Sequence, residues 1–198
     1  MKRTLFLSLA ALAISGLTHA NAANLVTNGS FEQGLGGIGS FTGWQTVLGD
    51  ASTFVDSSGQ TGTHPGQASD GLWSAYFGST AASGGSSISQ ILATSVGQTY
   101  LLTFDLANDN GGQPAHDALL ASVGGIPVFS ANLPTQDYAH ERVFFIASGT
   151  QTALSFSGYN DTGYLQLDNV AVAAVPEPAS LALLLVGGLG IGFIFRRD

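Results

Sequence analysis

Acidic side chains dominate the groups of this sequence that could do chemistry. Between residues 23 and 174 there is one basic side chain, Arg142, against eleven carboxylates, so this segment has a net charge of −10. Carboxylate oxygens with so few competing cations favour a hard cation such as Ca²⁺. The same charge repels phosphate backbones and excludes nucleic acid as a partner. The acids are Glu32, Asp50, Asp56, Asp70, Asp105, Asp109, Asp117, Asp137, Glu141, Asp161 and Asp168.

Nucleophiles and their usual partners are scarce. The sequence has no cysteine, which excludes thiol catalysis and cysteine-bound metals. The pairs His116-Asp117 and His140-Glu141 are sequence neighbours, which point to opposite faces of a strand. No HExxH or GxSxG pattern is present. We therefore expect no enzymatic activity; the alternative is a glycoside hydrolase that uses two of the carboxylates.

Exposed aromatic rings beside amide and carboxylate groups suit the recognition of a sugar, through stacking and hydrogen bonds. Trp73 and Tyr76 lie three residues apart, hence on opposite faces of a strand, and one of them is expected in the core. Tyr159, Asn160 and Asp109 fall in polar stretches that resemble loop tips, where binding residues collect. The candidate ligand-binding residues are Trp73, Tyr159, Asn160 and Asp109. The alternative is a core position for Trp73 and Asx turns in the loops.

The elements that must position these groups are short strands. Gly, Ser and Thr punctuate residues 23–174 every eight to twelve residues, and no segment there keeps a helical period. This pattern predicts an all-β fold, a β-sandwich or jelly roll. The expected strands are 25–28, 44–48, 52–56, 72–77, 87–92, 98–107, 118–123, 127–131, 142–147, 152–157 and 164–172.

The last expected strand changes its register. Leu165 and Leu167 are apolar at odd positions, whereas Val170 and Val172 are apolar at even positions. A strict period of two cannot bury both pairs, so we expect a β-bulge at Asp168-Asn169.

The opening Asn24-Leu25-Val26-Thr27-Asn28-Gly29-Ser30-Phe31-Glu32-Gln33-Gly34, followed by Gly43-Trp44, resembles that of galactose-binding-like jelly rolls, which include carbohydrate-binding modules. Residues 87–90, 97–104 and 164–170 resemble later strands of that family, in the same order. In the family a structural Ca²⁺ often ties the first strand to the last. The resemblance therefore implies Ca²⁺ bound by the side chains of Glu32 and Asp168, with main-chain oxygens near Asn28 and Ser30. The alternative is that both carboxylates only accept backbone N–H groups.

The two ends of the sequence contain segments that are typical of export and membrane attachment. Residues 1–22 have a basic start at Lys2-Arg3, an apolar run and small residues before Ala22, which is typical of a secretory signal peptide. The domain is then 23–174. Residues 179–195 form 17 uncharged positions, about 25 Å as a helix, near the short limit for a membrane span. Arg196 and Arg197 would stay cytoplasmic.

The tail, 175–198, resembles the PEP-CTERM protein-sorting signal. Val175-Pro176-Glu177-Pro178 precedes the apolar segment, and Arg196-Arg197 follows it. The resemblance implies a precursor tethered to the inner membrane of a Gram-negative bacterium and processed near this motif by an exosortase. We expect the mature form at the cell surface or in the extracellular matrix, where it binds or associates with extracellular polysaccharide. The alternative is a structural or adhesive matrix protein without a sugar pocket.

Overall fold

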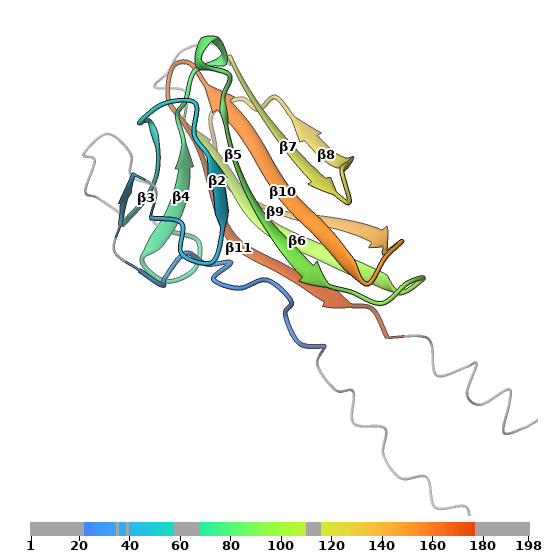
Figure 1. Cartoon of the computed structure of the whole chain (residues 1–198). Helices are drawn as coiled ribbons and strands as arrows, with labels where there is room; N and C mark the ends of the chain where they lie inside the picture. Colours follow the sequence, from blue (N-terminus) through green and yellow to red (C-terminus); the bar gives the residue numbers. More distant parts are fainter. Residues whose placement is uncertain (1–21, 35, 39, 58–67, 110–115, 177–198) are drawn as a thin grey trace, which may run out of the picture.

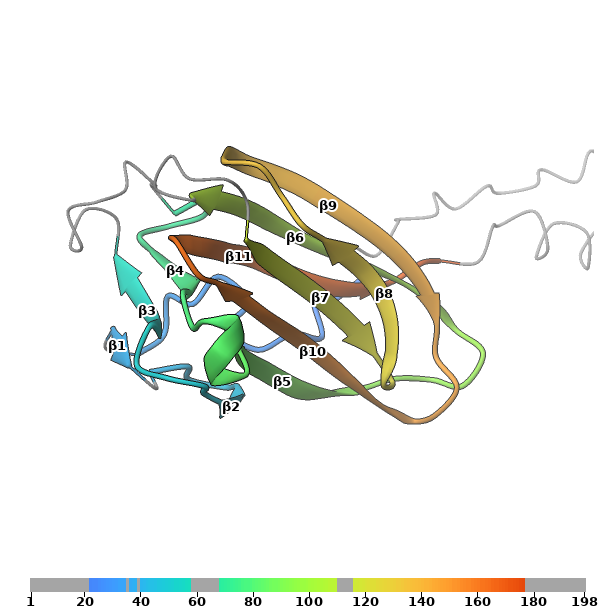
Figure 2. The same ribbon diagram turned by 90° about the horizontal axis from the view of Figure 1, so that it is seen from above.

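The structure is a computed structural model and describes residues 22–34, 36–38, 40–57, 68–109 and 116–176. Two antiparallel sheets face each other as a sandwich, which confirms the expected all-β fold (Figures 1 and 2). Among these residues no helix is long and apolar enough to span a membrane. Residues 1–21 of the predicted signal peptide and the predicted membrane helix, 179–195, lie outside the described residues.

The six-stranded sheet has the order β1-β3-β4-β11-β6-β9. The last strand of the chain, β11, therefore lies in the middle of this sheet, between β4 and β6. The strands are β1 (Gly37–Ile38), β3 (Thr53–Ser57), β4 (Trp73–Phe77), β6 (Thr99–Asp109), β9 (Gln136–Ile146) and β11 (Tyr164–Ala174).

The five-stranded sheet has the order β2-β5-β10-β7-β8. The succession β4-β11-β6-β9 in one sheet and β5-β10-β7-β8 in the other is the jelly-roll arrangement of two Greek keys. The strands are β2 (Gln45–Val47), β5 (Ser86–Ala93), β7 (Asp117–Val123), β8 (Ile126–Ala131) and β10 (Gln151–Asn160), and a 3₁₀ turn, η1 (Ala81–Ser83), precedes β5.

Alternation along the strands fills the space between the sheets. In β6 the side chains of Leu102, Phe104 and Leu106 are fully buried, and in β10 those of Leu154 and Phe156 meet them from the other sheet. The rings of Phe104 and Phe156 pack edge to face with centroids 5.2 Å apart. This core fixes which residues of each strand point outward.

The predicted bulge in β11 is confirmed. The pairing of β11 with β6 shifts its register between Asp168 and Ala171, and Asn169 takes a φ of 50°. Leu167 and Val170 can both enter the core because of this extra residue.

The expected strand 25–28 was wrong. Asn28 has a φ of 51°, which a strand does not accommodate, and the segment follows β11 through isolated bonds instead. Leu25 N donates to Val172 O at 2.8 Å, and the side chain of Asn24 accepts Val172 N at 2.9 Å. The two ends of the domain are therefore joined without a regular ladder.

Candidate functional site

A pocket with one aromatic wall opens on the outer face of the five-stranded sheet. Its volume is about 210 Å³. Tyr159 of β10 supplies the ring; the two glycines after η1, small residues of β5, β8 and β10, and alanine and leucine residues of β7 supply the rest of the lining. The lining residues are Gly84, Gly85, Ser86, Ala118, Leu119, Leu120, Ser130, Ser157, Gly158 and Tyr159.

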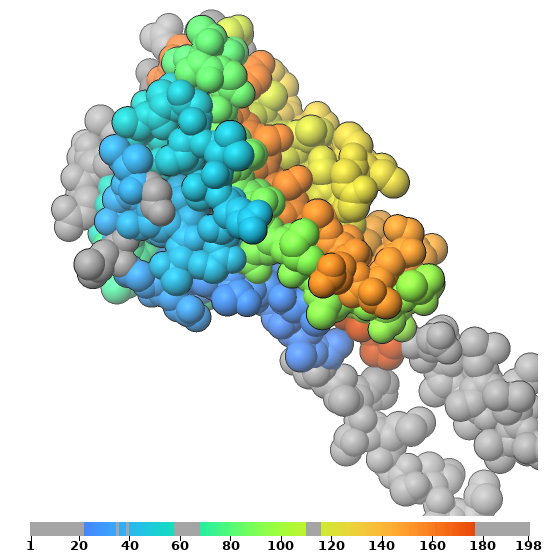
Figure 3. All heavy atoms as spheres, viewed as in Figure 1, coloured from blue at the N-terminus to red at the C-terminus, as the bar shows by residue number. Residues whose placement is uncertain are grey.

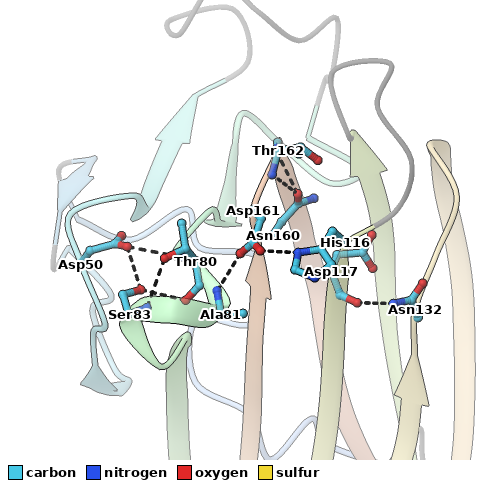
Figure 4. A network of polar contacts seen from close by, with 11 residues as sticks. Asp50, Thr80, Ala81, Ser83, His116, Asp117, Asn132, Asn160, Asp161 and Thr162 are labelled. Atoms are coloured by element: carbon cyan, nitrogen blue, oxygen red, sulfur yellow. Dashed lines mark hydrogen bonds and ion pairs between the residues drawn. The ribbon is translucent and has the colours of Figure 1, made fainter.

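The rim formed by Gly84 and Gly85 depends on Asp50. One carboxylate oxygen of Asp50 accepts Ser52 N and Ser79 Oγ, and the other accepts Thr80 N and Ser83 Oγ. These bonds, first the one from Ser52 N, lower the pKa of Asp50 to about 2 against the opposing effect of burial. The charged carboxylate thus fixes both ends of η1, directly before Gly84 (Figure 4).

A second carboxylate, Asp161, joins η1 to Tyr159. One oxygen of Asp161 accepts Ala81 N at 2.7 Å, and the other forms an ion pair with Nδ1 of His116 (Figure 4). The ring of His116 lies edge to face against that of Tyr159, with centroids 6.1 Å apart. The Asp161–His116 pair therefore supports one side of the Tyr159 ring.

Below Tyr159, a buried amide network closes the end of the sandwich. Asn160 is 1% exposed; its Oδ1 accepts Thr162 N and Gly163 N, and its Nδ2 donates to Asn108 Oδ1. Asn108 Nδ2 donates in turn to Asp117 Oδ2 at 2.9 Å. Asn160 therefore positions the turn after β10, and its amide faces the protein rather than the pocket.

The four sequence-predicted ligand-binding residues do not form one surface. Tyr159 lines the pocket, and Asn160 lies directly beneath it. Asp109 ends β6 in the other sheet, opposite Tyr164. Trp73 begins β4, is half-buried and packs on the core beside Gly36, so it is the core residue of the Trp73–Tyr76 pair.

Tyr76 lies on the opposite face of β4 from Trp73, as expected, and is also buried. Its ring stacks on Phe54 at 5.4 Å and meets Tyr164 edge to face at 5.8 Å. The three rings cover one another on the outer face of the six-stranded sheet, so Tyr76, at 2% exposure, offers no open platform.

Serines form a ladder beside the pocket, on the outer face of the five-stranded sheet. Ser89 of β5 pairs with Ser155 of β10, Ser87 pairs with Ser157, and Ser122 of β7 pairs with Ser155 on its other side. Away from Tyr159 this face carries these hydroxyl groups together with the exposed side chain of Ile91 in β5.

Glu32 and Asp168, the predicted Ca²⁺ ligands, hold the segment that leads into β4. Oε1 of Glu32 accepts Leu72 N at 2.7 Å and Trp73 N at 2.6 Å. Oδ2 of Asp168 accepts Asp70 N at 3.0 Å. Glu32 and Asp168 thus accept hydrogen bonds from backbone N–H groups, as the alternative to a calcium site predicted. Among the described residues no group of three His, Asp or Glu side chains converges as a metal site.

The other two predicted metal-site residues lie where the chain turns after the N-terminal segment. Asn28 donates from Nδ2 to Thr42 O and accepts Gln33 N on Oδ1, while its carbonyl oxygen accepts the indole N–H of Trp44 at 3.1 Å. Ser30 is partly exposed. The Asn28 oxygens are thus already engaged by N–H donors, and the calcium site stays a prediction.

Asp168 also belongs to an acidic cluster on the outer face of the six-stranded sheet. The hydroxyl of Ser69 lies 2.7 Å from Asp105 Oδ2 and 3.1 Å from Asp168 Oδ2, and Nδ1 of His140 lies 2.6 Å from Asp105 Oδ1. Burial raises the pKa of Asp168 to about 6. For Asp105 the hydrogen bonds from His140, Ser69 and Asn169 outweigh burial and lower the pKa.

Sequence reasoning missed the glycine rim, the serines and both histidine–carboxylate pairs. His116 bonds Asp161 and His140 bonds Asp105, rather than their sequence neighbours Asp117 and Glu141. Nothing in the spacing of these residues indicates the pairs, since they depend on the strand register. The adjacent Gly84-Gly85, both with positive φ, was the one local signal for a tight rim.

Solved structures similar to this sandwich include carbohydrate-binding modules, an adhesin domain and a region of a bacteriophage tailspike protein. The module TmCBM61, in complex with beta-1,4-galactotriose, has a TM-score of 0.56 and 14% identity over 78% of this chain and 100% of its own. The family 16 carbohydrate binding module-2 has a TM-score of 0.51 and 16% identity, over 76% of this chain and 99% of its own. The K1 cleaved adhesin domain of Lys-gingipain from Porphyromonas gingivalis W83 has a TM-score of 0.53 and 17% identity, over 74% of this chain and 96% of its own. The fold is thus the β-sandwich found in carbohydrate-binding modules.

The C-terminal segment identifies the chain further. Residues 174–197 match the PEP-CTERM protein-sorting motif, so this chain carries that motif as the sequence indicated. The motif implies an exported surface protein processed by an exosortase. No curated protein matches the chain in sequence.

Proposed function

We propose that this chain is a non-enzymatic surface protein whose sandwich binds extracellular polysaccharide through the Tyr159 pocket. The observation that carries the proposal is the Tyr159 ring, packed against His116, in a pocket otherwise lined by glycine, serine, alanine and leucine residues. A ring of this kind stacks on the C–H groups of a sugar, and Ser130 and Ser157 offer hydroxyls beside it. Carbohydrate binding by proteins with the same fold supports the class of ligand.

The size of the pocket suits one sugar unit. At about 210 Å³ it is smaller than the roughly 300–1,000 Å³ of pockets for drug-sized ligands. The serine ladder continues from Ser157 away from Tyr159, and the other aromatic residue of β10, Phe156, points into the core, so the outer face of β5 and β10 has no second aromatic ring. We therefore expect recognition of a chain end or a side branch, with low affinity per site.

The test is a glycan array on residues 23–176 with two alanine variants. Tyr159→Ala removes the wall and should weaken binding about tenfold, because the stacking contact is lost. The matched control is Phe144→Ala, an aromatic residue 62% exposed on β9 in the other sheet. Ser157→Leu places a larger side chain in the pocket and should abolish binding. Binding to no glycan, or equal loss in Tyr159→Ala and Phe144→Ala, contradicts the proposal.

A second candidate function is a structural or adhesive body without a sugar pocket. The serine ladder favours it, because paired serines without an aromatic ring between them offer no stacking platform for a sugar. The fold of the gingipain adhesin domain shows that such sandwiches also occur in adhesins. A host that makes no exopolysaccharide separates the two functions. The sugar-binding protein should be lost from its cell surface, whereas the adhesive protein should stay.

Processing is proposed to occur near Pro176-Glu177-Pro178, with residues 179–195 as the membrane segment of the precursor. The matching sorting motif supports this step. Replacing these three residues with alanine should leave a full-length precursor in the membrane fraction of a native host. Maturation at the normal rate would remove the sorting proposal.

Structural Ca²⁺ remains a further proposal. Its support is that Glu32 and Asp168 hold the segment before β4, from Ser69 to Trp73, so an ion there would tie the beginning of the domain to β11. Binding would require the carboxylates to exchange N–H donors for the cation.

A further inference from the structure

Exposed apolar side chains gather at the end of the sandwich where β11 finishes. Val96 is 66% exposed in the turn between β5 and β6, and Phe144 and Ile146 are 62% and 69% exposed at the end of β9. The turn and the strand end are joined by Gly97 N to Ala147 O at 2.8 Å and Ala147 N to Gln98 O at 3.1 Å. We call Val96, Phe144 and Ile146 the tail-end surface.

The sorting tail leaves from this same end. Val175 N donates to Thr99 O at 2.9 Å, and Val175 O accepts the side chain of Gln98 at 2.8 Å. Figures 1 and 3 show the end of β11 beside the β5–β6 turn. The domain therefore grips the chain up to Val175, the first residue of the Val-Pro-Glu-Pro sequence.

The tether between this grip and the apolar segment is short. Pro176, Glu177 and Pro178 are the three residues before Ala179, and fully extended they span about 10 Å. The apolar run of 17 residues gives a helix of about 25 Å, shorter than the roughly 30 Å hydrocarbon layer. Because the connection and the proposed membrane helix are both short, the end of the sandwich must lie close to the membrane surface in a membrane-attached precursor.

The charge distribution suits that position. The sequence carries no acidic or basic residue in 91–101, 143–153 or 171–176, the segments that form this end. All eleven carboxylates of the domain lie elsewhere. An anionic leaflet would repel acidic groups brought within a Debye length, so an end without them can approach lipid closely.

We propose that the tail-end surface rests on the lipid bilayer while the precursor is attached to the membrane. The inference depends on the proposed membrane segment 179–195. Docking would hold Val175 and the following Pro-Glu-Pro at a fixed height above the bilayer. Three apolar side chains give only weak, reversible attachment, so the domain leaves the membrane once the tail is cut.

The absence of cysteine in the chain allows a direct test with single labelled cysteines. Residues 23–198 are reconstituted in vesicles of phosphatidylethanolamine and phosphatidylglycerol with a nitroxide quencher in the headgroup region. Val96→Cys and Ile146→Cys carry a fluorophore at the tail-end surface. The matched control is Val47→Cys, 71% exposed in β2 opposite Ser87. Leu184→Cys reports on the apolar segment itself.

The labels at positions 96 and 146 should lose about twofold more fluorescence than the label at 47, because only they reach the headgroups. Equal quenching at all three positions, with the label at 184 shielded in lipid, overturns the inference and leaves the sorting proposal intact. A label at 184 exposed to water overturns both. Cross-links between copies through position 96, without quenching by the lipid nitroxide, would assign this surface to a second copy of the chain and also overturn the inference.

Discussion

The side-chain amide of Gln90 makes both hydrogen bonds of the backbone of Thr27. Its Oε1 accepts Thr27 N at 3.0 Å and its Nε2 donates to Thr27 O at 2.6 Å. The amide thus takes the place of a neighbouring strand's backbone and holds the irregular N-terminal segment against β5. This contact explains a glutamine at an inward position of β5, between the buried side chains of Ile88 and Leu92.

Gln90→Ala should lower the free energy of unfolding by about 2 kcal/mol, because two backbone groups lose their partner. Gln90→Glu keeps the acceptor but sets a carboxylate oxygen against Thr27 O, so it should not rescue stability. Urea unfolding measures both variants. Gln45→Ala, an exposed glutamine in β2, is the control and should be neutral. Equal stability of Gln90→Ala and Gln45→Ala would show that the amide bridge contributes nothing.

Gly29→Ala should destabilise the domain by about 3 kcal/mol, since a Cβ there would lie 1.9 Å from the backbone oxygen of Val170. Val170 N donates to Gly29 O at 2.9 Å, so the clash falls on a contact that joins the two ends of the domain. The melting temperature measures the loss. Gly149→Ala, whose nearest atom would be 3.2 Å away, should be mild by comparison. A Gly29→Ala variant as stable as Gly149→Ala would mean that the two segments separate freely.

Asp50 should make stability depend on pH in the acid range. Its pKa is lowered to about 2 from an ordinary 3.8, so its contribution is present above about pH 4 and is lost as the pH falls through 2. Asp50→Asn should therefore be less stable than the wild type at pH 7 and equal to it near pH 1.5. Asp137→Asn, which also removes one carboxylate, controls for net charge. A constant difference for Asp50→Asn from pH 7 to pH 1.5 contradicts the assigned role of the charge.

Binding of the proposed Ca²⁺ should change the pKa of Asp168. In chelated protein this carboxyl should titrate near pH 6, and its contribution to stability should be present below about pH 4 and lost as the pH rises through 6. Ca²⁺ should lower that pKa well below its ordinary value, because a cation favours the charged form. Carboxyl NMR measures the titration.

The matching stability measurement is thermal unfolding with Ca²⁺ or EDTA. The melting temperature should fall on chelation, and Glu32→Gln should remove the difference. Protein shown by elemental analysis to contain calcium, yet with a melting temperature insensitive to EDTA, would exclude a structural site.

The sequence predicted most strands because each alternates over a half-buried surface. The bulge was also predictable, since the apolar positions of β11 change parity around Asp168 and Asn169. The start of β9 was placed too late, at Arg142 instead of Gln136. Its first residues include Asp137 and His140, which face solvent on an edge strand and therefore carry no apolar alternation.

Of the residues that line the pocket, the sequence indicated only Tyr159. Tyr159 stands out as an aromatic residue in a polar stretch, but the residues opposite it come from β5, β7 and β8. Their meeting depends on register, for instance Tyr159 opposite Ala118. Asn160 looked like a ligand-binding amide for the same compositional reason, and burial gave it an internal partner instead.

The central place of β11 has a consequence for the order of events during export. The strand that separates β4 from β6, and that the N-terminal segment bonds through Val172, is made of the last residues of the domain. Residues 22–163 emerge without it and cannot close either the six-stranded sheet or the contact between the chain ends. The complete sandwich therefore cannot form until residues 164–174, the last strand that the structure describes, are free to pair with β4 and β6.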